Sequence, residues 1–238
     1  MKLSARDTAL VVIDMQTILF DPAPAEAEEV VARINGLASR ARAANVPVVW
    51  VQHETAAGDL VADTPGWRLH PGLATAPSDL FLRKKMSDAF LRTSLHGQLA
   101  ERGVRHVVVC GYSSEFCVDS SVRGAAARGY AVTLAADAHT SHDKPHATGL
   151  QIRLHENETL RNISSFHVAI DAVPALSATA TPSASAISSF VAPCLTASAA
   201  CTVMQPSQRV VTATASAISS RVLASRWPVA APALDSVA

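Results

Sequence analysis

Aromatic side chains and excess charge are both scarce in this chain of 238 residues. Phe, Trp and Tyr make up only 5% of it although hydrophobic residues reach 49%, so its core must consist mainly of Val, Leu, Ile and Ala. Lys and Arg number 20 and balance the 20 Asp and Glu, giving a formal net charge of zero. This balance argues against a nucleic-acid partner, because proteins that bind nucleic acids usually carry a basic surface.

Cysteines and long apolar runs are also few. The four cysteines, Cys110, Cys117, Cys194 and Cys201, are too few and too irregularly spaced for a disulfide framework, and no C-x-x-C motif occurs. The apolar run near the amino terminus is preceded by charges and ends already at Asp14. A signal peptide or a membrane span needs a longer uncharged run. We therefore expect a cytoplasmic protein without membrane contact.

The composition changes abruptly near residue 172. No charged residue occurs from Ala172 to Gln208, and the rest of the chain is rich in Ala, Ser, Thr and Val. The segment S-A-S-A-I-S-S at 183–189 returns as T-A-S-A-I-S-S at 214–220, without a sustained helical or strand period. We predict a folded domain at 1–171 and a disordered, low-complexity tail at 172–238. Self-association of the tail, or a shifted reading frame after residue 171, would also account for its composition.

Up to residue 171, apolar runs typical of strands alternate with helical patterns. The runs predict strands at 8–14, 46–52, 79–83, 106–111, 130–137 and 163–170. The 3.6-residue periodicity predicts helices at 26–44, 93–102, 116–128 and 145–160. Strand and helix in alternation indicate parallel strands joined by helical crossovers. We predict a three-layer α/β/α sandwich with a six-stranded, mostly parallel, doubly wound sheet.

Three reactive side chains come directly after predicted strands. Asp14 ends the first strand, Lys84 follows the third, and Cys117 follows the fourth at the start of a helix. In open parallel sheets ligands bind at the carboxyl ends of the strands, so these side chains should meet at one edge. Taken singly, each has a plainer explanation as a helix cap, a solvated lysine or a small buried hydrophobe. Their predicted convergence favours a reactive site.

These residue types suit nucleophilic catalysis. A cysteine at a helix N-terminus and beside an ammonium group such as that of Lys84 should have a lowered pKa. Asp14 would accept the thiol proton and return it to a leaving group. The backbone N–H groups of Ser113 and Cys117 would stabilise the oxyanion that forms when a thiolate attacks a carbonyl.

Three segments together resemble the cysteine hydrolases of the isochorismatase-like superfamily. They are A-L-V-V-I-D-M-Q at 9–16, D-L-F-L-R-K-K-M-S-D-A-F-L-R-T-S-L at 79–95 and C-G-Y-S-S-E-F-C-V at 110–118. The match runs in order from about residue 8 to residue 170. It implies that Asp14 is the general base and Cys117 the nucleophile. The superfamily places its lysine six residues before the Phe of an Ala-Phe pair, and Phe90 thereby selects Lys84 over Lys85.

The same resemblance bears on the turn before the nucleophile and on the pocket. It implies a cis peptide bond between Tyr112 and Ser113, which would aim the Ser113 N–H into the oxyanion hole. The segments V-Q-H-E at 51–54, T-P-G-W-R-L-H-P at 64–71 and D-A-H-T-S-H-D at 137–143 resemble the streptothricin-hydrolase-like branch. We predict that the walls of the substrate pocket include Gln16, Phe20, Trp67 and Tyr112.

The sequence predicts no metal site and no cofactor. Nicotinamidases of the superfamily have an Asp-x-His metal motif after the second strand, but here no Asp stands two positions before His53. The remaining histidines of the candidate loops also lack the spacing of a closed three- or four-ligand site. These are His70, His139, His142 and His146.

The resemblance implies hydrolysis of a C–N bond in a small amide, lactam or ureido compound, through a thioester on Cys117. Two alternatives stay open. One is hydrolysis of a vinyl ether of the isochorismate type, for which the cysteine is dispensable. The other is a catalytically silent member of the superfamily whose tail binds a partner. The resemblance further implies a homodimer or homotetramer.

Overall fold

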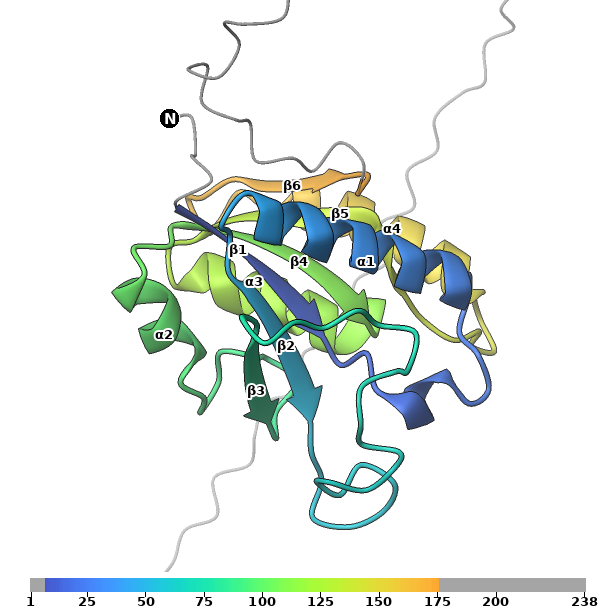
Figure 1. Ribbon diagram of the computed structural model, residues 1–238. Helices are drawn as coiled ribbons and strands as arrows, with labels where there is room; N and C mark the ends of the chain where they lie inside the picture. The colour runs from blue at the N-terminus through green and yellow to red at the C-terminus, as the bar shows by residue number, and fades with distance from the viewer. Residues whose placement is uncertain (1–6, 176–238) are drawn as a thin grey trace, which may run out of the picture. The chain divides into compact units, whose positions relative to one another are not determined.

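Six parallel strands form the centre of the structure, a computed structural model that describes residues 7–175 (Figure 1). Their order in the sheet is β3-β2-β1-β4-β5-β6, and every neighbouring pair is parallel. The strands are β1 (Thr8–Ile13), β2 (Val48–His53), β3 (Leu80–Lys84), β4 (His106–Tyr112), β5 (Ala131–Thr140) and β6 (Ile170–Val173). The predicted doubly wound α/β sheet is thus confirmed.

Helices cover both faces of this sheet. The α-helices are α1 (Ala27–Ala43), α2 (Leu95–Glu101), α3 (Asp119–Ala127) and α4 (Gly149–Arg161). Helix α1 packs alone on one face, in front of the sheet in Figure 1, and the other three pack on the opposite face. Two short helical turns, η2 (Thr17–Phe20) and η3 (Ser114–Val118), follow β1 and β4.

Burial on both faces explains why the central strands appear in the sequence as continuous apolar runs. In β1, Ala9, Val11 and Ile13 point into the core that α2 and α3 share. Leu10 and Val12 alternate with them and point into the core under α1. All six residues of β1 are buried, as expected for the centre of a parallel sheet.

The chain reverses its direction across the sheet between β1 and β4. From β1 it adds β2 and β3 on one side, then returns to place β4 and β5 on the other side. Gly111 allows β1 and β4 to approach closely, because a Cβ atom there would lie 2.1 Å from the carbonyl oxygen of Ile13. The carboxyl ends of β1 and β4 therefore form the switch point at which open α/β sheets bind ligands.

The sixth strand was predicted in the wrong place. The apolar run at 163–170 forms turns after α4, with Ile163 N–H bonded to Leu160 and His167 N–H bonded to Ser164. The strand itself is Ile170–Val173, so the folded chain continues past the predicted boundary at residue 171. Ala175 is also buried, at 1% exposure. The remainder of the predicted tail, 176–238, lies outside the described residues.

Local hydrogen bonds explain two further shifts of helix boundaries. Helix α4 begins at Gly149, later than predicted, because Thr148 and Gln151 form a capping box there. The helix predicted at 116–128 is divided into the π-turn η3 and the α-helix α3. Cys117 therefore lies inside a π-turn, one of the helical irregularities that often occur at functional sites.

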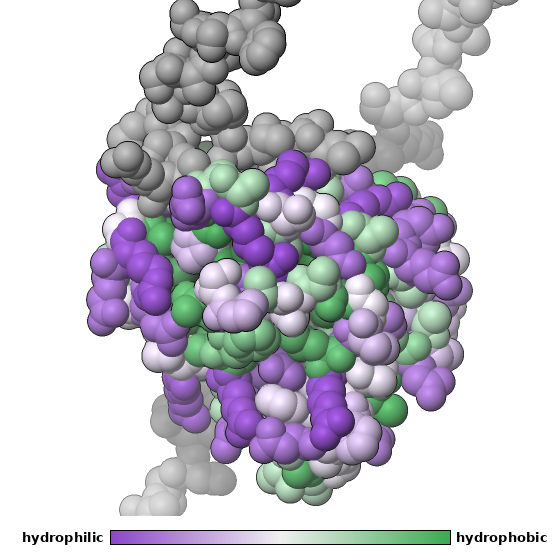
Figure 2. Space-filling model, in the orientation of Figure 1, coloured by the Kyte–Doolittle hydropathy of each residue, from purple (hydrophilic) through white to green (hydrophobic). Residues whose placement is uncertain are grey.

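The surface on the α1 side shows hydrophobic side chains near its middle and hydrophilic ones along its borders (Figure 2). Of the described helices, none has the length and apolar character that crossing a membrane requires.

Candidate active site

The side chains of Asp14, Lys84 and Cys117 meet at the carboxyl edge of the sheet. Lys84 Nζ lies 2.6 Å from Asp14 Oδ2 and 3.2 Å from Cys117 Sγ. Asp14 directly follows β1, Lys84 is the last residue of β3, and Cys117 lies in η3 after β4. Both charged residues are only 1% exposed, and Cys117 is partly exposed. The three residues that the sequence placed at one edge are therefore in mutual contact.

The two neighbouring lysines have opposite environments. The Lys84 ammonium also lies 3.2 Å from His53 Nδ1 and donates to the Met86 carbonyl at 3.1 Å. The Lys85 side chain is 73% exposed and lies 3.5 Å from Glu54. Of these two lysines, only Lys84 is buried and contacts residues from several separate segments of the chain.

Burial controls the protonation of this cluster. It raises the pKa of Asp14, and the nearby Lys84 ammonium only partly opposes that effect. Burial, together with the negative Asp14, raises the pKa of Cys117 to about 12, although Lys84 acts in the opposite direction. The predicted lowering of the Cys117 pKa is wrong, because the loss of solvation outweighs the ammonium. In the absence of substrate the sulfur thus keeps its proton.

The turn before Cys117 has the unusual backbone that the resemblance implied. The peptide bond between Tyr112 and Ser113 is cis. The Ser113 carbonyl accepts hydrogen bonds from the N–H groups of Phe116 and Val118, each at 3.1 Å. The Ser113 hydroxyl donates to Glu115 at 2.7 Å. These bonds fix the segment that carries Cys117 against the end of β4.

His139 holds the same segment through a hydrogen bond with Ser114, a role that the sequence did not reveal. The Asn157 amide donates to the Ala136 carbonyl, so its Oδ1 atom accepts from His139 Nε2 at 2.9 Å. His139 Nδ1 is then an acceptor, and the Ser114 hydroxyl donates to it at 2.8 Å. Burial lowers the pKa of His139 to about 4, so the ring is neutral. It therefore supports the turn and carries no charge.

Two of the four predicted pocket residues lie together. The ring centroids of Phe20 and Tyr112 are 6.4 Å apart, and Phe20 also packs on His70 at 4.8 Å. The Tyr112 hydroxyl is 2.8 Å from His142 Nδ1, and His142 Nε2 is 2.8 Å from the Pro22 carbonyl. Tyr112, the first residue of the cis peptide bond, thus contacts both Phe20 and His142.

Gln16 and Trp67 have a different setting. The buried Gln16 amide donates to the carbonyls of His53 and Trp67 and accepts the His53 N–H, at 2.8 to 2.9 Å. It therefore ties the end of β2 to the long loop. Trp67 is 8% exposed, and the Arg83 guanidinium lies 4.7 Å from the centroid of its ring.

One group of side chains in the described part of the chain has ligand atoms close enough together to hold a metal ion. It consists of Asp14, His53 and Cys117. Their ligand atoms all lie within 4.8 Å of one another. Lys84 Nζ, however, lies within 3.2 Å of one such atom of each residue. The ammonium thus occupies the space between the three ligand atoms, and a metal ion would have to displace it.

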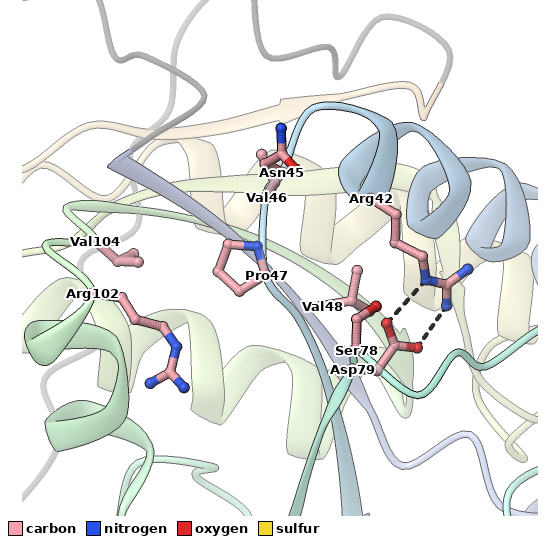
Figure 3. A pocket seen from close by; sticks show the side chains of 9 residues that line it. All are labelled: Arg42, Asn45, Val46, Pro47, Val48, Ser78, Asp79, Arg102 and Val104. Atoms are coloured by element: carbon pink, nitrogen blue, oxygen red, sulfur yellow. Dashed lines mark hydrogen bonds and ion pairs between the residues drawn. The ribbon is translucent and has the colours of Figure 1, made fainter.

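A second ion pair lies at the opposite, amino edge of the sheet (Figure 3). It borders a hollow of about 380 Å³ near the start of β2. Asp79 accepts hydrogen bonds from the Arg42 guanidinium at 2.7 and 2.9 Å, the Trp50 indole at 2.8 Å and the Ala76 N–H at 2.8 Å. Burial disfavours the carboxylate, but these hydrogen bonds prevail and lower the pKa of Asp79.

The model of the isochorismatase domain matches residues 8–157, a span that includes the whole cluster of Asp14, Lys84 and Cys117. The chain belongs to the isochorismatase family.

Individual relatives agree with this membership. A streptothricin hydrolase of Streptomyces noursei is 41% identical over 142 residues, which are 58% of this chain and 51% of that protein. The uncharacterized isochorismatase family protein YecD of Escherichia coli O157:H7 is 35% identical over 154 residues, covering 58% of this chain and 82% of YecD. The crystal structure of an isochorismatase from Pseudomonas putida KT2440 superposes with a TM-score of 0.65 at 27% identity, covering 74% of this chain and 92% of that one. The chain spans only about half the length of the streptothricin hydrolase.

Proposed function

We propose that this chain is a cysteine hydrolase that cleaves a C–N bond of a small amide, lactam or ureido compound. The observation that carries the proposal is the contact of Lys84 Nζ with both Asp14 Oδ2, at 2.6 Å, and Cys117 Sγ, at 3.2 Å. An acid, a cation and a thiol rarely converge at the switch point of a parallel sheet for structural reasons alone. The family membership and the similarity to a streptothricin hydrolase support a hydrolytic reaction.

In the first step the proton of the Cys117 thiol passes to Asp14 as the sulfur attacks the carbonyl carbon of the substrate. A free thiolate would be scarce, because the pKa of Cys117 is raised to about 12. Proton transfer coupled to the attack avoids that species. The raised pKa of Asp14 makes its carboxylate a stronger base than an exposed one. The Lys84 side chain lies beside both groups and compensates the negative charge on Asp14 or on sulfur.

The attack creates an oxyanion beside the cis peptide. We assign the N–H groups of Ser113 and Cys117 as its hydrogen-bond donors. The tetrahedral intermediate collapses when the C–N bond breaks and Asp14 gives its proton to the departing nitrogen. The acyl group stays on Cys117 as a thioester.

Water completes the reaction. Asp14, again a carboxylate, takes a proton from a water molecule that attacks the thioester carbon. The C–S bond breaks, the Cys117 sulfur recovers the proton, and the acid product leaves. The same three side chains thus serve both half-reactions, as in other covalent triads.

The pocket walls favour a compact substrate with an apolar part. Phe20 and Tyr112 supply ring surface beside the nucleophile turn. The Gln16 side-chain amide donates to the Trp67 carbonyl and so holds the long loop that follows β2. Hydrolysis of a vinyl ether does not require a thiol, so the contact between Lys84 and Cys117 favours the covalent route over that alternative.

A screen of small amides, lactams and ureido compounds with detection of released ammonia or amine tests this proposal. We expect turnover with the full chain and a loss of at least about a thousand-fold in Cys117→Ala. Cys110→Ala is the matched control, because Cys110 is fully buried in the core under α1, whereas Cys117 packs against the core on the other face of the sheet. Cys110→Ala should retain activity. Equal turnover in Cys117→Ala and wild type would contradict the covalent scheme.

A further inference from the structure

Glu156 is a buried carboxyl group, and one of its oxygen atoms is unpaired within the described part of the chain. It lies in α4 with an exposure of 9%, and its Oε2 atom has no hydrogen-bond partner among residues 7–175. Leaving a buried carboxylate unpaired is costly, and native proteins seldom do so without a reason. Burial raises the pKa of Glu156, because the charged carboxylate loses its solvation there.

The carboxyl group lies in the wall of a hollow of about 640 Å³ between η3, the loop after β5 and the first turns of α4. This volume is within the range of pockets that hold small molecules. Phe116 and Ile152 supply apolar surface, and the polar residues around them are Glu115, Lys144, His146, Gln151 and His155. The Phe116 side chain is 57% exposed and accessible to a ligand.

The charges around the hollow leave Glu156 uncompensated. Glu115 is paired with Lys144 at 3.3 Å, and Asp119, which raises the pKa of Glu156, is paired with Arg123 at 2.7 Å. Each neighbouring acid therefore has its own base. Glu156 has no ion-pair partner of its own among residues 7–175, so a single positive charge in the hollow would balance its carboxylate.

We propose that this hollow is a binding site for a small organic cation, a molecule with one ammonium or guanidinium group on a short apolar body. The cationic group donates hydrogen bonds to Glu156, and the apolar body packs on Phe116 and Ile152. The Phe116 ring already attracts a cation, since Lys144 Nζ lies 5.7 Å from its centroid.

A metal ion fits the hollow less well than an organic cation. Among the described residues, no group of three metal-ligand atoms lies around Glu156. The group that the structure does contain is that of Asp14, His53 and Cys117. A single carboxylate beside apolar walls offers a metal too few ligands.

The site has a structural connection to the nucleophile turn. Glu115 borders the hollow and also accepts hydrogen bonds from Ser113 at 2.7 Å and Ser141 at 2.8 Å. A bound cation would compete with Lys144 for Glu115 and thereby affect the turn that holds Cys117. Binding itself uses none of the three proposed catalytic side chains, so it can be measured in Cys117→Ala and does not depend on the proposed reaction.

Isothermal titration calorimetry of the full chain with n-butylammonium chloride tests the site, with n-butanol as the neutral isostere. We expect one saturable site for the cation and none for the alcohol. Glu156→Gln should raise the dissociation constant at least about tenfold, which is the loss of about 1.4 kcal/mol. The matched control is Glu158→Gln on the same helix, where the side chain is exposed and paired with Arg161, and it should bind as wild type does.

Two results would overturn the proposal. One is an equal affinity of wild type and Glu156→Gln for the cation, as expected if Glu156 is simply protonated and buried. The other is a wild-type protein that associates through this site, with a molar mass that falls when n-butylammonium is added; a basic side chain of a second copy would then be the occupant. If Glu156→Gln fails to give a native circular dichroism spectrum, Phe116→Leu replaces it and should weaken binding severalfold; unchanged binding in that variant would also contradict the site.

Discussion

The two edges of the sheet each hold a buried aspartate in contact with a base, but the two pairs differ in their hydrogen bonding. At the amino edge, Asp79 accepts four hydrogen bonds, from Arg42, Trp50 and Ala76. At the carboxyl edge, Asp14 is held through Oδ2 by Lys84, while its buried Oδ1 atom has no hydrogen-bond partner among the described residues. The pKa of Asp79 is lowered and that of Asp14 is raised.

The comparison separates an ion pair that stabilises the fold from one that is available for proton transfer. The four hydrogen bonds to Asp79 stabilise its carboxylate over the protonated form, although the group is buried. Asp14 has fewer such hydrogen bonds, so burial favours its protonated form. The thiol of Cys117 lies close enough to supply the proton. Buried charges that are incompletely satisfied are typical of active sites, where stability is sacrificed for reactivity.

The largest effect on activity should come from Asp14→Asn. An amide cannot accept the thiol proton, so we expect kcat/KM to fall about a thousand-fold or more. The assay is amine release from the best substrate of the amide screen. Activity within a few-fold of wild type would remove Asp14 from the mechanism and end the contrast between the two edges.

Asp79→Asn should instead lower the stability of the fold and leave the activity nearly unchanged. Removing one partner of a buried ion pair leaves the other uncompensated, so we expect a loss of about 3 kcal/mol in the free energy of unfolding. Urea denaturation followed by circular dichroism measures it, and kcat/KM of the folded fraction should stay within a few-fold of wild type. Asp14→Asn should be destabilised less, because the fold raises the pKa of Asp14 and so disfavours its carboxylate, whereas it lowers the pKa of Asp79 and favours that carboxylate. The reverse order of stability would contradict our interpretation of the two pairs.

The adjacent residues Lys84 and Lys85 test whether activity depends on the contact with the Cys117 thiol or only on a nearby positive charge. Lys84→Met removes the ammonium between Asp14 and Cys117, and we expect kcat/KM to fall about a hundred-fold. Lys85→Met changes the same charge at a side chain that is 73% exposed, and its effect should be less than about twofold. Similar losses in both variants would show that only the local charge matters, not the contact with the thiol.

His139 gives the smallest effect, a dependence of stability on pH. Its pKa is lowered to about 4 in the folded chain, so only the unfolded chain takes up a proton as the pH falls below the ordinary value near 6.5. The stabilisation is complete above that value and is lost as the pH falls, by about 2 kcal/mol at pH 5. His139→Gln should be less stable at neutral pH but show a flatter profile in urea denaturation between pH 7 and pH 5. An identical pH profile in both proteins would contradict a neutral, buried His139.

The fold was largely predictable from the sequence because the central strands of its sheet are mostly buried on both faces. β1 and β4 therefore appear as runs such as T-A-L-V-V-I and H-V-V-V-C-G. The apolar run at 163–170 misled the prediction of β6, since the turns after α4 also contain apolar residues. That strand is only four residues long, too short to give a period of its own.

The positions of Asp14, Lys84 and Cys117 also followed from the sequence, through the rule that strand ends meet at one edge. The raised pKa of Cys117 did not follow, because the burial of this side chain depends on packing that no local motif encodes. The role of His139 was hidden for the same reason, since its partners Ser114 and Asn157 lie 25 and 18 residues away. Long-range contacts of this kind emerge only from the folded chain.

The most direct test of the central claim is to detect an acyl group on Cys117 during turnover. Wild-type protein mixed with excess substrate is quenched in acid within milliseconds, and its intact mass and its peptides are measured by mass spectrometry. We expect a mass increase equal to the acyl part of the substrate, located on the peptide with Cys117, sensitive to hydroxylamine and absent from Cys117→Ala. Turnover by Cys117→Ala at the wild-type rate, with no adduct on either protein, would contradict Cys117 as the nucleophile.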